Sequence, residues 1–184
     1  MNDICCIGHI TRDKIITPHH EAFISGGTAF YFSYAIARLP RKVSYQLVTK
    51  LGRFDVEEVK RMRAERIDVL AFTCDNSVFF ENRYEGDQNK RTQRVLSKCE
   101  PFKISEMNGI EAKVFHLGSL LNDDFSADFI RELSTRGRIS IDAQGFLREV
   151  RGQKVVPVDW EEKHKILKHT HTLKLNEHEM KVIT

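Results

Sequence analysis

Short apolar runs alternate with amphipathic segments along the 184 residues, and this alternation constrains the fold more than any other feature of the sequence. The runs are short and bounded by turn residues, which is typical of buried strands. Their apolar character does not alternate strictly, as in strands that are covered on both faces of a parallel sheet. They lie at 3–10, 43–49, 66–73, 113–120, 138–145 and 170–175.

Segments with helical periodicity separate most of these runs, at 28–40, 55–67, 123–137 and 159–169. Pro40 is expected to end the first of these helices, and Asp55 is expected to cap the second. Strands that alternate with helices of this length predict βαβ units and a mostly parallel sheet. The sequence therefore predicts an α/β fold.

Two further stretches are predicted to form polar hairpins. The first spans 13–27, turns around Pro18, and is closed by Gly26 and Gly27. The second spans 77–96 and turns at 86–90. Because both faces of the second hairpin carry polar groups, we expect it to be exposed or to cover another part of the molecule.

Charge and cysteine usage exclude several classes of protein. The net charge is only +3, and the basic residues are interspersed with acids, which favours a solvated surface over a nucleic-acid groove. No run approaches the roughly 18 apolar residues of a membrane helix, and the first residues do not form a signal peptide. The cysteines show no C-x-x-C spacing, which predicts reduced thiols in a cytoplasmic protein. They are Cys5, Cys6, Cys74 and Cys99.

Polar groups follow several of the expected strands. In an open parallel sheet, ligands bind beyond the carboxyl ends of the strands, so these positions are candidate site residues. The sharp nucleotide-binding and hydrolase motifs, including the P-loop and G-x-S-x-G, are absent from the sequence. The candidates are Asp13, Gly26 with Gly27, Asp142 with Arg148, and Asn176 with Glu179.

Each candidate also has a purely structural interpretation. Asp13 alone fits a turn residue, the glycine pair fits a tight turn, and Asp142 with Arg148 fits a surface ion pair. Asn176 and Glu179 have the spacing of a capping box at a helix start. The residues alone leave these alternatives open.

His169 and His171 share one face of the expected last strand. Imidazoles are common zinc ligands, but no third ligand lies at a usable spacing. The sequence therefore gives these two histidines little support as a metal site.

The segments IGHITRD, GGTAFYFSYAIARL, FENRYEGDQNKRTQ, IDAQGFLR and KLNEHE, in this order, resemble the PfkB (ribokinase-like) carbohydrate kinase family. The resemblance runs over essentially the whole chain. The stretches FENRY and DAQGFLR are most similar to a subgroup of sugar or polyol kinases, some of them near inositol-related pathways.

The resemblance implies a ribokinase-like three-layer α/β/α core with a mostly parallel sheet and a small β-lid. Residues 1–184 would be the N-terminal part of one kinase domain, with lid segments at about 12–25 and 73–98. The family's catalytic aspartate, in a G-A-G-D type motif that forms the anion hole, lies downstream of the N-x-x-E pair and is absent here. The segment is therefore expected to be the front part of a longer kinase, without a catalytic base and inactive on its own.

The resemblance also assigns acceptor-binding residues. Asp13 would accept hydrogen bonds from acceptor hydroxyls, and Gly26 and Gly27 would let the backbone approach the substrate. Asn82 and Arg83 would point inward from the lid. These five positions form the expected acceptor site.

In the same family, the N-x-x-E pair organises hydrated Mg²⁺ and phosphate, which falls on Asn176 and Glu179. The expected activity is ATP- and Mg²⁺-dependent transfer of the γ-phosphoryl group to a hydroxyl of a sugar or polyol, in the cytoplasm. Neither nucleic acid nor membrane is an expected partner, and lids of this family imply a homodimer through the lid. The alternatives are a nucleoside kinase of the same fold, and a non-catalytic sugar-binding or regulatory relative.

Overall fold

The computed structural model describes residues 1–40, 43–85 and 91–183. Its core is a six-stranded sheet, sheet A, with the order β12-β9-β8-β1-β4-β5. Every strand pair in sheet A is parallel, as the sequence predicts. The strands are β1 (Asn2–Ile7), β4 (Tyr45–Gly52), β5 (Asp68–Cys74), β8 (Ala112–Gly118), β9 (Arg138–Asp142) and β12 (Thr172–Lys174).

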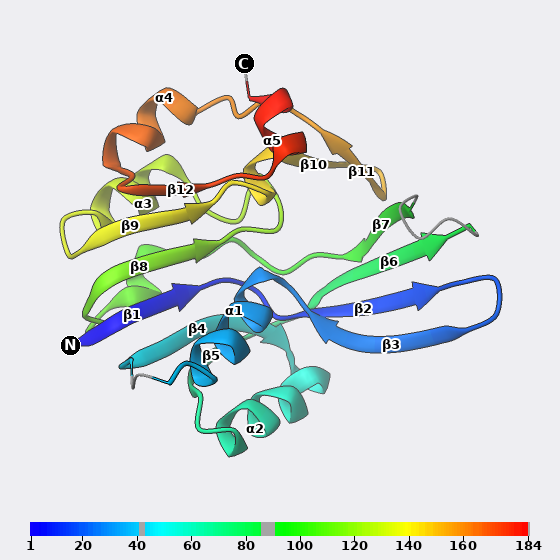
Figure 1. Ribbon diagram of the computed structural model, residues 1–184, viewed down its shortest axis with the longest axis horizontal. Coiled ribbons are helices and arrows are strands. Elements are labelled where there is room, and N and C mark those ends of the chain that lie inside the picture. Colours follow the sequence, from blue (N-terminus) through cyan, green and yellow to red (C-terminus); the bar gives the residue numbers. More distant parts are fainter. Residues whose placement is uncertain (41–42, 86–90, 184) are drawn as a thin grey trace.

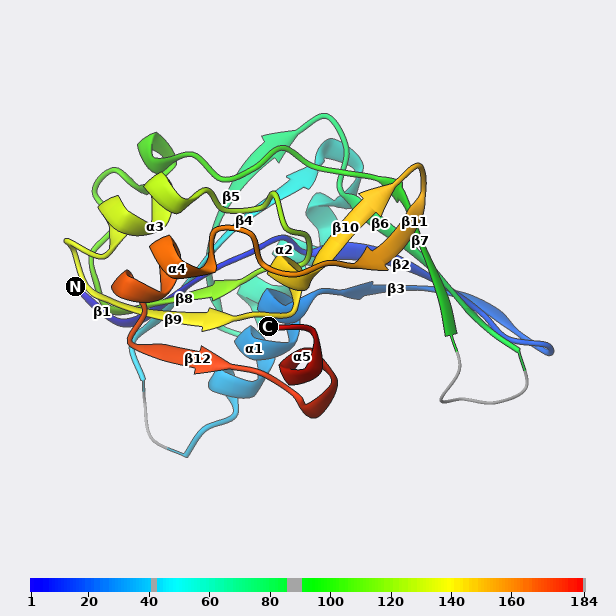
Figure 2. The same cartoon turned by 90° about the horizontal axis from the view of Figure 1, so that it is seen from above.

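Helices cover both faces of sheet A (Figure 2). One apolar cluster joins α3 (Ala127–Leu133) and α4 (Lys163–Ile166) to one face. Another joins α1 (Thr28–Ala37) and α2 (Val56–Ala64) to the other. Cys5 lies in the first cluster and Cys6 in the second, because successive side chains of a strand point to opposite faces. The core is a three-layer α/β/α arrangement.

The observed helices lie within the predicted segments but are shorter, most clearly α3 and α4. α1 stops at Ala37, before Pro40. Asp55 occupies the position before α2, but its carboxylate accepts a 2.5 Å hydrogen bond from the Ser77 hydroxyl and does not cap the helix. Ser126 caps α3 by accepting from the Phe129 amide at 3.1 Å. The last helix, α5 (Glu177–Val182), begins after Asn176.

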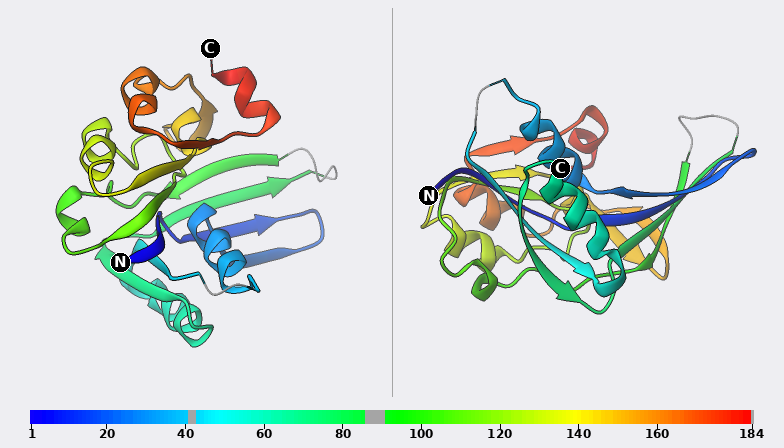
Figure 3. Two further views of the ribbon diagram at one scale, coloured as in Figure 1. Left: turned by 60° about the vertical axis from the view of Figure 1, so that its left-hand side comes forward. Right: turned by 90° about the horizontal axis from the view of Figure 1, so that it is seen from below.

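The two predicted hairpins belong to one second sheet, sheet B, with the order β10-β11-β7-β6-β2-β3. It projects from the end of sheet A (Figures 1 and 3). Parallel pairing of β2 with β6 joins the first hairpin to the second. The turn predicted at 86–90 lies outside the described residues. The strands are β2 (Thr11–Ile16), β3 (Glu21–Gly26), β6 (Val78–Tyr84), β7 (Arg91–Ser97), β10 (Arg148–Arg151) and β11 (Lys154–Pro157).

A disulfide joins Cys74 to Cys99, with their Cα atoms 6.1 Å apart. The prediction that all four thiols are reduced is therefore wrong for this pair. Cys74 ends β5 and Cys99 follows β7, so the bond closes the base of the β6–β7 hairpin. Cys5 and Cys6 remain free and buried. The pairing depends on the route of the chain between the two cysteines, which the C-x-x-C criterion does not consider.

Loss of this disulfide is expected to destabilise the protein by about 3 kcal/mol, because it releases a loop with a sequence separation of 25 residues. Urea unfolding of the wild type, with and without a dithiol reductant, measures the change. The Cys99→Ser variant is the matched control, since the reductant should have no further effect on it. A reduced wild type as stable as the oxidised protein would contradict a structural role for the bond.

None of the helices in the described part of the chain is long and apolar enough to cross a membrane.

Candidate functional site

A cavity of about 210 Å³ lies between sheet B and the carboxyl ends of the core strands. Residues of sheet B, of the start of α1 and of the loops that follow β8 and β9 line it, so it forms where an open parallel sheet is expected to bind its ligand. The lining residues are Thr11, Asp13, Gly27, Thr28, Tyr31, Phe80, Arg91, Gln93, Leu120, Gln144 and Arg148.

Asp13 lies within β2, paired with Ile24 and Phe80 in the neighbouring strands, so it is not a turn residue. Among the described residues, Asp13 Oδ1 is buried without a hydrogen-bond partner, and so is the Thr11 hydroxyl. Burial raises the pKa of the Asp13 carboxyl, while the Thr11 hydroxyl and the Arg91 guanidinium oppose that rise. A buried acceptor without a donor is costly, and a ligand hydroxyl would satisfy it.

Gly26 and Gly27 permit a close approach that a side chain would prevent. A Cβ on Gly26 would lie 2.9 Å from Asp13 Oδ2. Gly27 has φ of +98°, and a Cβ there would lie 2.6 Å from the His9 carbonyl oxygen. Gly26 therefore brings the end of β3 against the Asp13 carboxylate, and Gly27 brings the start of α1 against the His9 backbone, which goes beyond the requirements of a tight turn.

The β6–β7 hairpin presents Asn82 on the same face as Phe80, which lines the cavity. Asn82 is buried, and its Oδ1 accepts a 2.8 Å hydrogen bond from Gln93 Nε2. Arg83 is exposed and points to the opposite face of the strand. The prediction that both side chains point inward therefore fails for Arg83.

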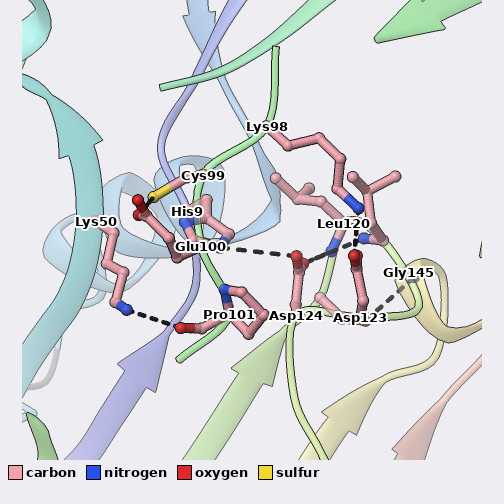
Figure 4. A network of polar contacts seen from close by, with 12 residues as sticks. His9, Lys50, Lys98, Cys99, Glu100, Pro101, Leu120, Asp123, Asp124 and Gly145 are labelled. Carbon is pink, nitrogen blue, oxygen red and sulfur yellow. Dashed lines mark hydrogen bonds and ion pairs between the residues drawn. The ribbon is translucent and has the colours of Figure 1, made fainter. Parts of the chain in front are cut away.

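A buried polar network holds the loop that follows β8 (Figure 4). Asp124 Oδ2 accepts hydrogen bonds from the backbone amides of Leu120 and Leu121, at 2.6 and 3.1 Å. His9 is the second residue after β1, and its Nε2 lies 3.6 Å from Asp124 Oδ1. Burial lowers the pKa of His9 and raises that of Asp124. This pair fixes Leu120 at the cavity wall, and no motif in the sequence indicates it.

Asn176 and Glu179 form a complete capping box at the start of α5. Asn176 Oδ1 accepts from the amides of His178 and Glu179, both at 2.9 Å. Glu179 Oε2 accepts from the Asn176 amide at 2.8 Å, and Glu179 Oε1 accepts from Asn176 Nδ2 at 2.7 Å. The capping interpretation is confirmed, and the Mg²⁺ and phosphate role stays a prediction.

A second cavity, of about 320 Å³, adjoins this box and is lined by Asn176 and Glu179. Gln144 and Arg148 line both this cavity and the one that holds Asp13. Asp13 and Asn176 are 163 positions apart in the sequence. The cavities that hold them nevertheless adjoin, with Arg148 in the wall of both.

Asp142 is buried and pairs with Lys174, whose Nζ lies 3.2 Å from Asp142 Oδ1. A surface ion pair between Asp142 and Arg148 is therefore not what the structure shows. His171 precedes β12, and its Nδ1 accepts from the Ile139 amide at 3.2 Å, while His169 Nδ1 lies 3.2 Å from the Ser134 hydroxyl. Both histidines thus have structural partners.

Among the described residues, one group has ligand atoms close enough together to hold a metal ion: Cys74, Cys99 and Glu100. The two cysteines of this group form the disulfide, so their thiolates are not available as ligands. A larger hollow of about 650 Å³ lies on the other face of β2 and is lined by Arg12, Phe23 and Glu58. It does not include Asp13, so we place the candidate site in the smaller cavity.

The structure matches solved structures of ribokinase-family kinases. A pyrophosphate-dependent kinase of that family matches 98% of this chain with a TM-score of 0.90 and 29% identity. A complex of such a kinase with a pyrophosphate analog and myo-inositol also matches 98% of this chain, with a TM-score of 0.89 and 28% identity. The chain has the ribokinase-like fold. The resemblance to ribokinase-family kinases, including inositol kinases, is thereby confirmed.

A more distant match to the same fold is a Burkholderia thailandensis nucleoside kinase in complex with inosine, with 98% of this chain covered, a TM-score of 0.72 and 17% identity. The chain spans 64%, 64% and 62% of the lengths of these three structures. No protein-family model matches the sequence, and no curated protein matches it significantly. The assignment of the ribokinase-like fold thus rests on structural comparison.

Proposed function

We propose that this chain supplies the acceptor-binding part of a kinase that transfers a phosphoryl group to a hydroxyl of a small polyol. The observation that carries the proposal is Asp13 Oδ1, which is buried at the cavity without a hydrogen-bond donor among the described residues. A polyol hydroxyl is the donor that this oxygen lacks. Asp13 would bind and orient the attacking hydroxyl, and orientation accounts for much of the catalysis of phosphoryl transfer.

The size of the cavity favours a small polyol over a nucleoside. Its volume of about 210 Å³ is below the roughly 300–1,000 Å³ of pockets for drug-sized ligands. The match with 28% identity was solved with myo-inositol, whereas the nucleoside kinase match has 17% identity and supports the fold alone. We therefore propose a cyclitol such as myo-inositol as the acceptor class.

The Asn82–Gln93 pair is our candidate for selecting the acceptor position. In a further match, with 27% identity, leucine substitutions at an asparagine and a serine eleven positions apart convert a myo-inositol-1 kinase into a myo-inositol-3 kinase. Asn82 and Gln93 are also eleven positions apart, with glutamine in place of serine, and they are hydrogen-bonded to each other across β6 and β7. We propose that the Asn82 and Gln93 side chains contact ring hydroxyls of the acceptor and so set the orientation of the ring.

The phosphoryl donor is proposed as a polyphosphate, either ATP or pyrophosphate. The sequence predicts ATP, but the matches with 28% and 29% identity are described as pyrophosphate-dependent. Glu179 offers carboxylate oxygens at the second cavity, and Mg²⁺ prefers such ligands while it keeps several waters. Asn176 and Glu179 would thus hold hydrated Mg²⁺, which would neutralise charge on the donor phosphates.

Sheet B would cover the acceptor and exclude water, which otherwise competes with the hydroxyl for the phosphoryl group. A homodimer through sheet B remains a prediction. Among the described strands, β3 is an edge strand of sheet B, and its side chains Phe23 and Ile24 are exposed.

The test is a phosphorylation assay on the full-length protein with myo-inositol, other cyclitols, sugars and inosine as acceptors. Each acceptor is paired with ATP or pyrophosphate in the presence of Mg²⁺, and products are identified by ³¹P NMR. We expect the highest kcat/KM with a cyclitol and one of the two donors. Preference for inosine would contradict the acceptor assignment, and cyclitol binding without transfer would support a non-catalytic sugar-binding protein instead.

A further inference from the structure

Asp124 lies in the loop between β8 and α3 and contacts three chain segments that converge on the proposed acceptor cavity. Its Oδ2 accepts hydrogen bonds from the amides of Leu120 and Leu121 in its own loop. Its Oδ1 faces His9, in the connection from β1 to β2 (Figure 4). Its backbone carbonyl accepts from the Phe102 amide at 3.0 Å, in the segment that leads from β7 to β8. Asp124 thus ties these three segments together.

The two leucines that Asp124 holds form the surface on which the β6–β7 hairpin packs. Leu120 and Leu121 belong to one buried apolar cluster with three residues of the hairpin strands, Val78, Phe80 and Val95. Phe80 pairs in register with Asp13 in β2, and it lines the acceptor cavity together with Leu120. The positions of these leucines therefore influence the distance between the core loops and Asp13.

Ser119 fixes the start of the same loop. Its hydroxyl donates to the Asp142 carbonyl at 2.8 Å and accepts from the Gly145 amide at 3.1 Å. A Cβ on Gly145 would lie 2.5 Å from the Leu120 nitrogen, so the turn after β9 packs directly against the loop. From this fixed start, the hydrogen bonds to Asp124 determine the course of the next two residues toward the hairpin.

We propose that Asp124 is a positioning residue for acceptor binding. This inference rests on the proposed function. By holding the amides of Leu120 and Leu121, the carboxylate keeps the hairpin at the distance from the core at which a polyol reaches Asp13 and the opposite wall of the cavity. Asp124 itself does not line that cavity, so it acts through the leucines. A displacement of about 1 Å can cost about 100-fold in rate, because transfer depends on the position of the attacking hydroxyl.

The rival explanation is that Asp124 only stabilises its own turn. Both roles predict a lower Tm for Asp124→Ala, because two buried amides lose their acceptor. The roles differ in the kinetics of the folded protein. A residue that only stabilises the turn leaves the acceptor KM unchanged, whereas a positioning residue raises the acceptor KM, leaves the donor KM unchanged, and depends on Leu120 for its effect.

The experiment compares wild type, Asp124→Ala and Asp124→Asn in the full-length protein. Asp124→Asn keeps one side-chain oxygen, which can accept from both amides as Oδ2 does. Asp123→Ala is the matched control, because Asp123 is the preceding residue, is exposed, and pairs with Lys98. Leu120→Ala and the double variant Leu120→Ala/Asp124→Ala complete a cycle. The readouts are kcat, the KM of myo-inositol and of the donor, and the Kd of myo-inositol by calorimetry.

We expect Asp124→Ala to raise the acceptor KM and Kd about 10- to 100-fold, with the donor KM near its wild-type value. Asp124→Asn should recover most of this loss, and Asp123→Ala should match wild type. In the Leu120→Ala background, Asp124→Ala should raise the acceptor KM much less than it does in wild type, because residues that act through one another are not additive.

Circular dichroism checks the folding of each variant. If Asp124→Ala does not fold, Asp124→Ser takes its place with the same expectations, because a serine hydroxyl is too short to reach both amides. A folded variant with the wild-type acceptor KM and Kd would overturn the proposal, and so would additive effects in the double variant. A wild type that neither binds nor phosphorylates a polyol would instead overturn the proposed function on which this inference rests.

Discussion

Asp13→Asn is expected to reduce kcat/KM for the acceptor by roughly 10- to 150-fold, because one hydrogen bond to a charged group contributes about 1.5–3 kcal/mol. The Tm of this variant should stay the same or rise. Burial raises the pKa of Asp13 above its ordinary value, so the ionised carboxylate lowers stability at neutral pH and the neutral amide removes that cost. Steady-state kinetics and thermal unfolding measure the two effects.

The same direction of shift predicts the pH dependence. If the ionised Asp13 binds the acceptor, kcat/KM should fall as the pH drops through its raised pKa, above the ordinary aspartate value of about 3.9. Glu21→Gln is the matched control, since Glu21 is an exposed carboxylate of the same hairpin and pairs with Lys14 at 3.0 Å. Unchanged kinetics with a lowered Tm in Asp13→Asn would make Asp13 a structural residue.

Glu179→Gln is expected to lower kcat by about 10- to 100-fold, as for residues that support a metal through its outer shell. Excess Mg²⁺ should recover part of the loss, because hydrated Mg²⁺ prefers charged oxygens. The stability should fall only slightly. The single side-chain oxygen of the substituted glutamine would still accept from the Asn176 amide, although its NH₂ group would then face Asn176 Nδ2. A titration of activity against Mg²⁺ and a thermal unfolding curve separate these two effects.

Glu177→Gln controls for charge at the same helix start. Glu177 lies in the first turn of α5, is exposed, and takes no part in the capping box. Its substitution should leave the Mg²⁺ requirement unchanged. A Glu179→Gln variant with the wild-type activity and Mg²⁺ requirement would reduce the N-x-x-E pair to a helix cap.

The parallel core could be predicted because its strands are apolar on both faces. Cys5 and Cys6 show the reason, since one packs under α3 and α4 and the other under α1 and α2. β10 and β11 could not be predicted in the same way. They are four-residue strands of mixed polarity, and β11 joins sheet B through one register pair, Lys154 with Arg94.

The site could be predicted only in part. Asp13 and the N-x-x-E pair stand out because each follows an apolar run. Arg148 also follows an apolar run, but the sequence pairs it with Asp142, whereas its place at the walls of two cavities depends on the three-dimensional fold. The prediction that Arg83 points inward is wrong for a related reason. Only the register of β6 against β2 determines that Asn82 and Phe80 share the face that lies toward Asp13.

The most direct test of the central claim is the structure of the protein in complex with myo-inositol. We expect a ring hydroxyl within hydrogen-bond distance of Asp13 Oδ1, about 2.5–3.0 Å. We also expect the ring to lie against Gly27 and Gln93, with the hydroxyl to be phosphorylated facing the cavity that holds Asn176 and Glu179. A cyclitol bound in another cavity, with Asp13 Oδ1 still unpartnered, would contradict the account.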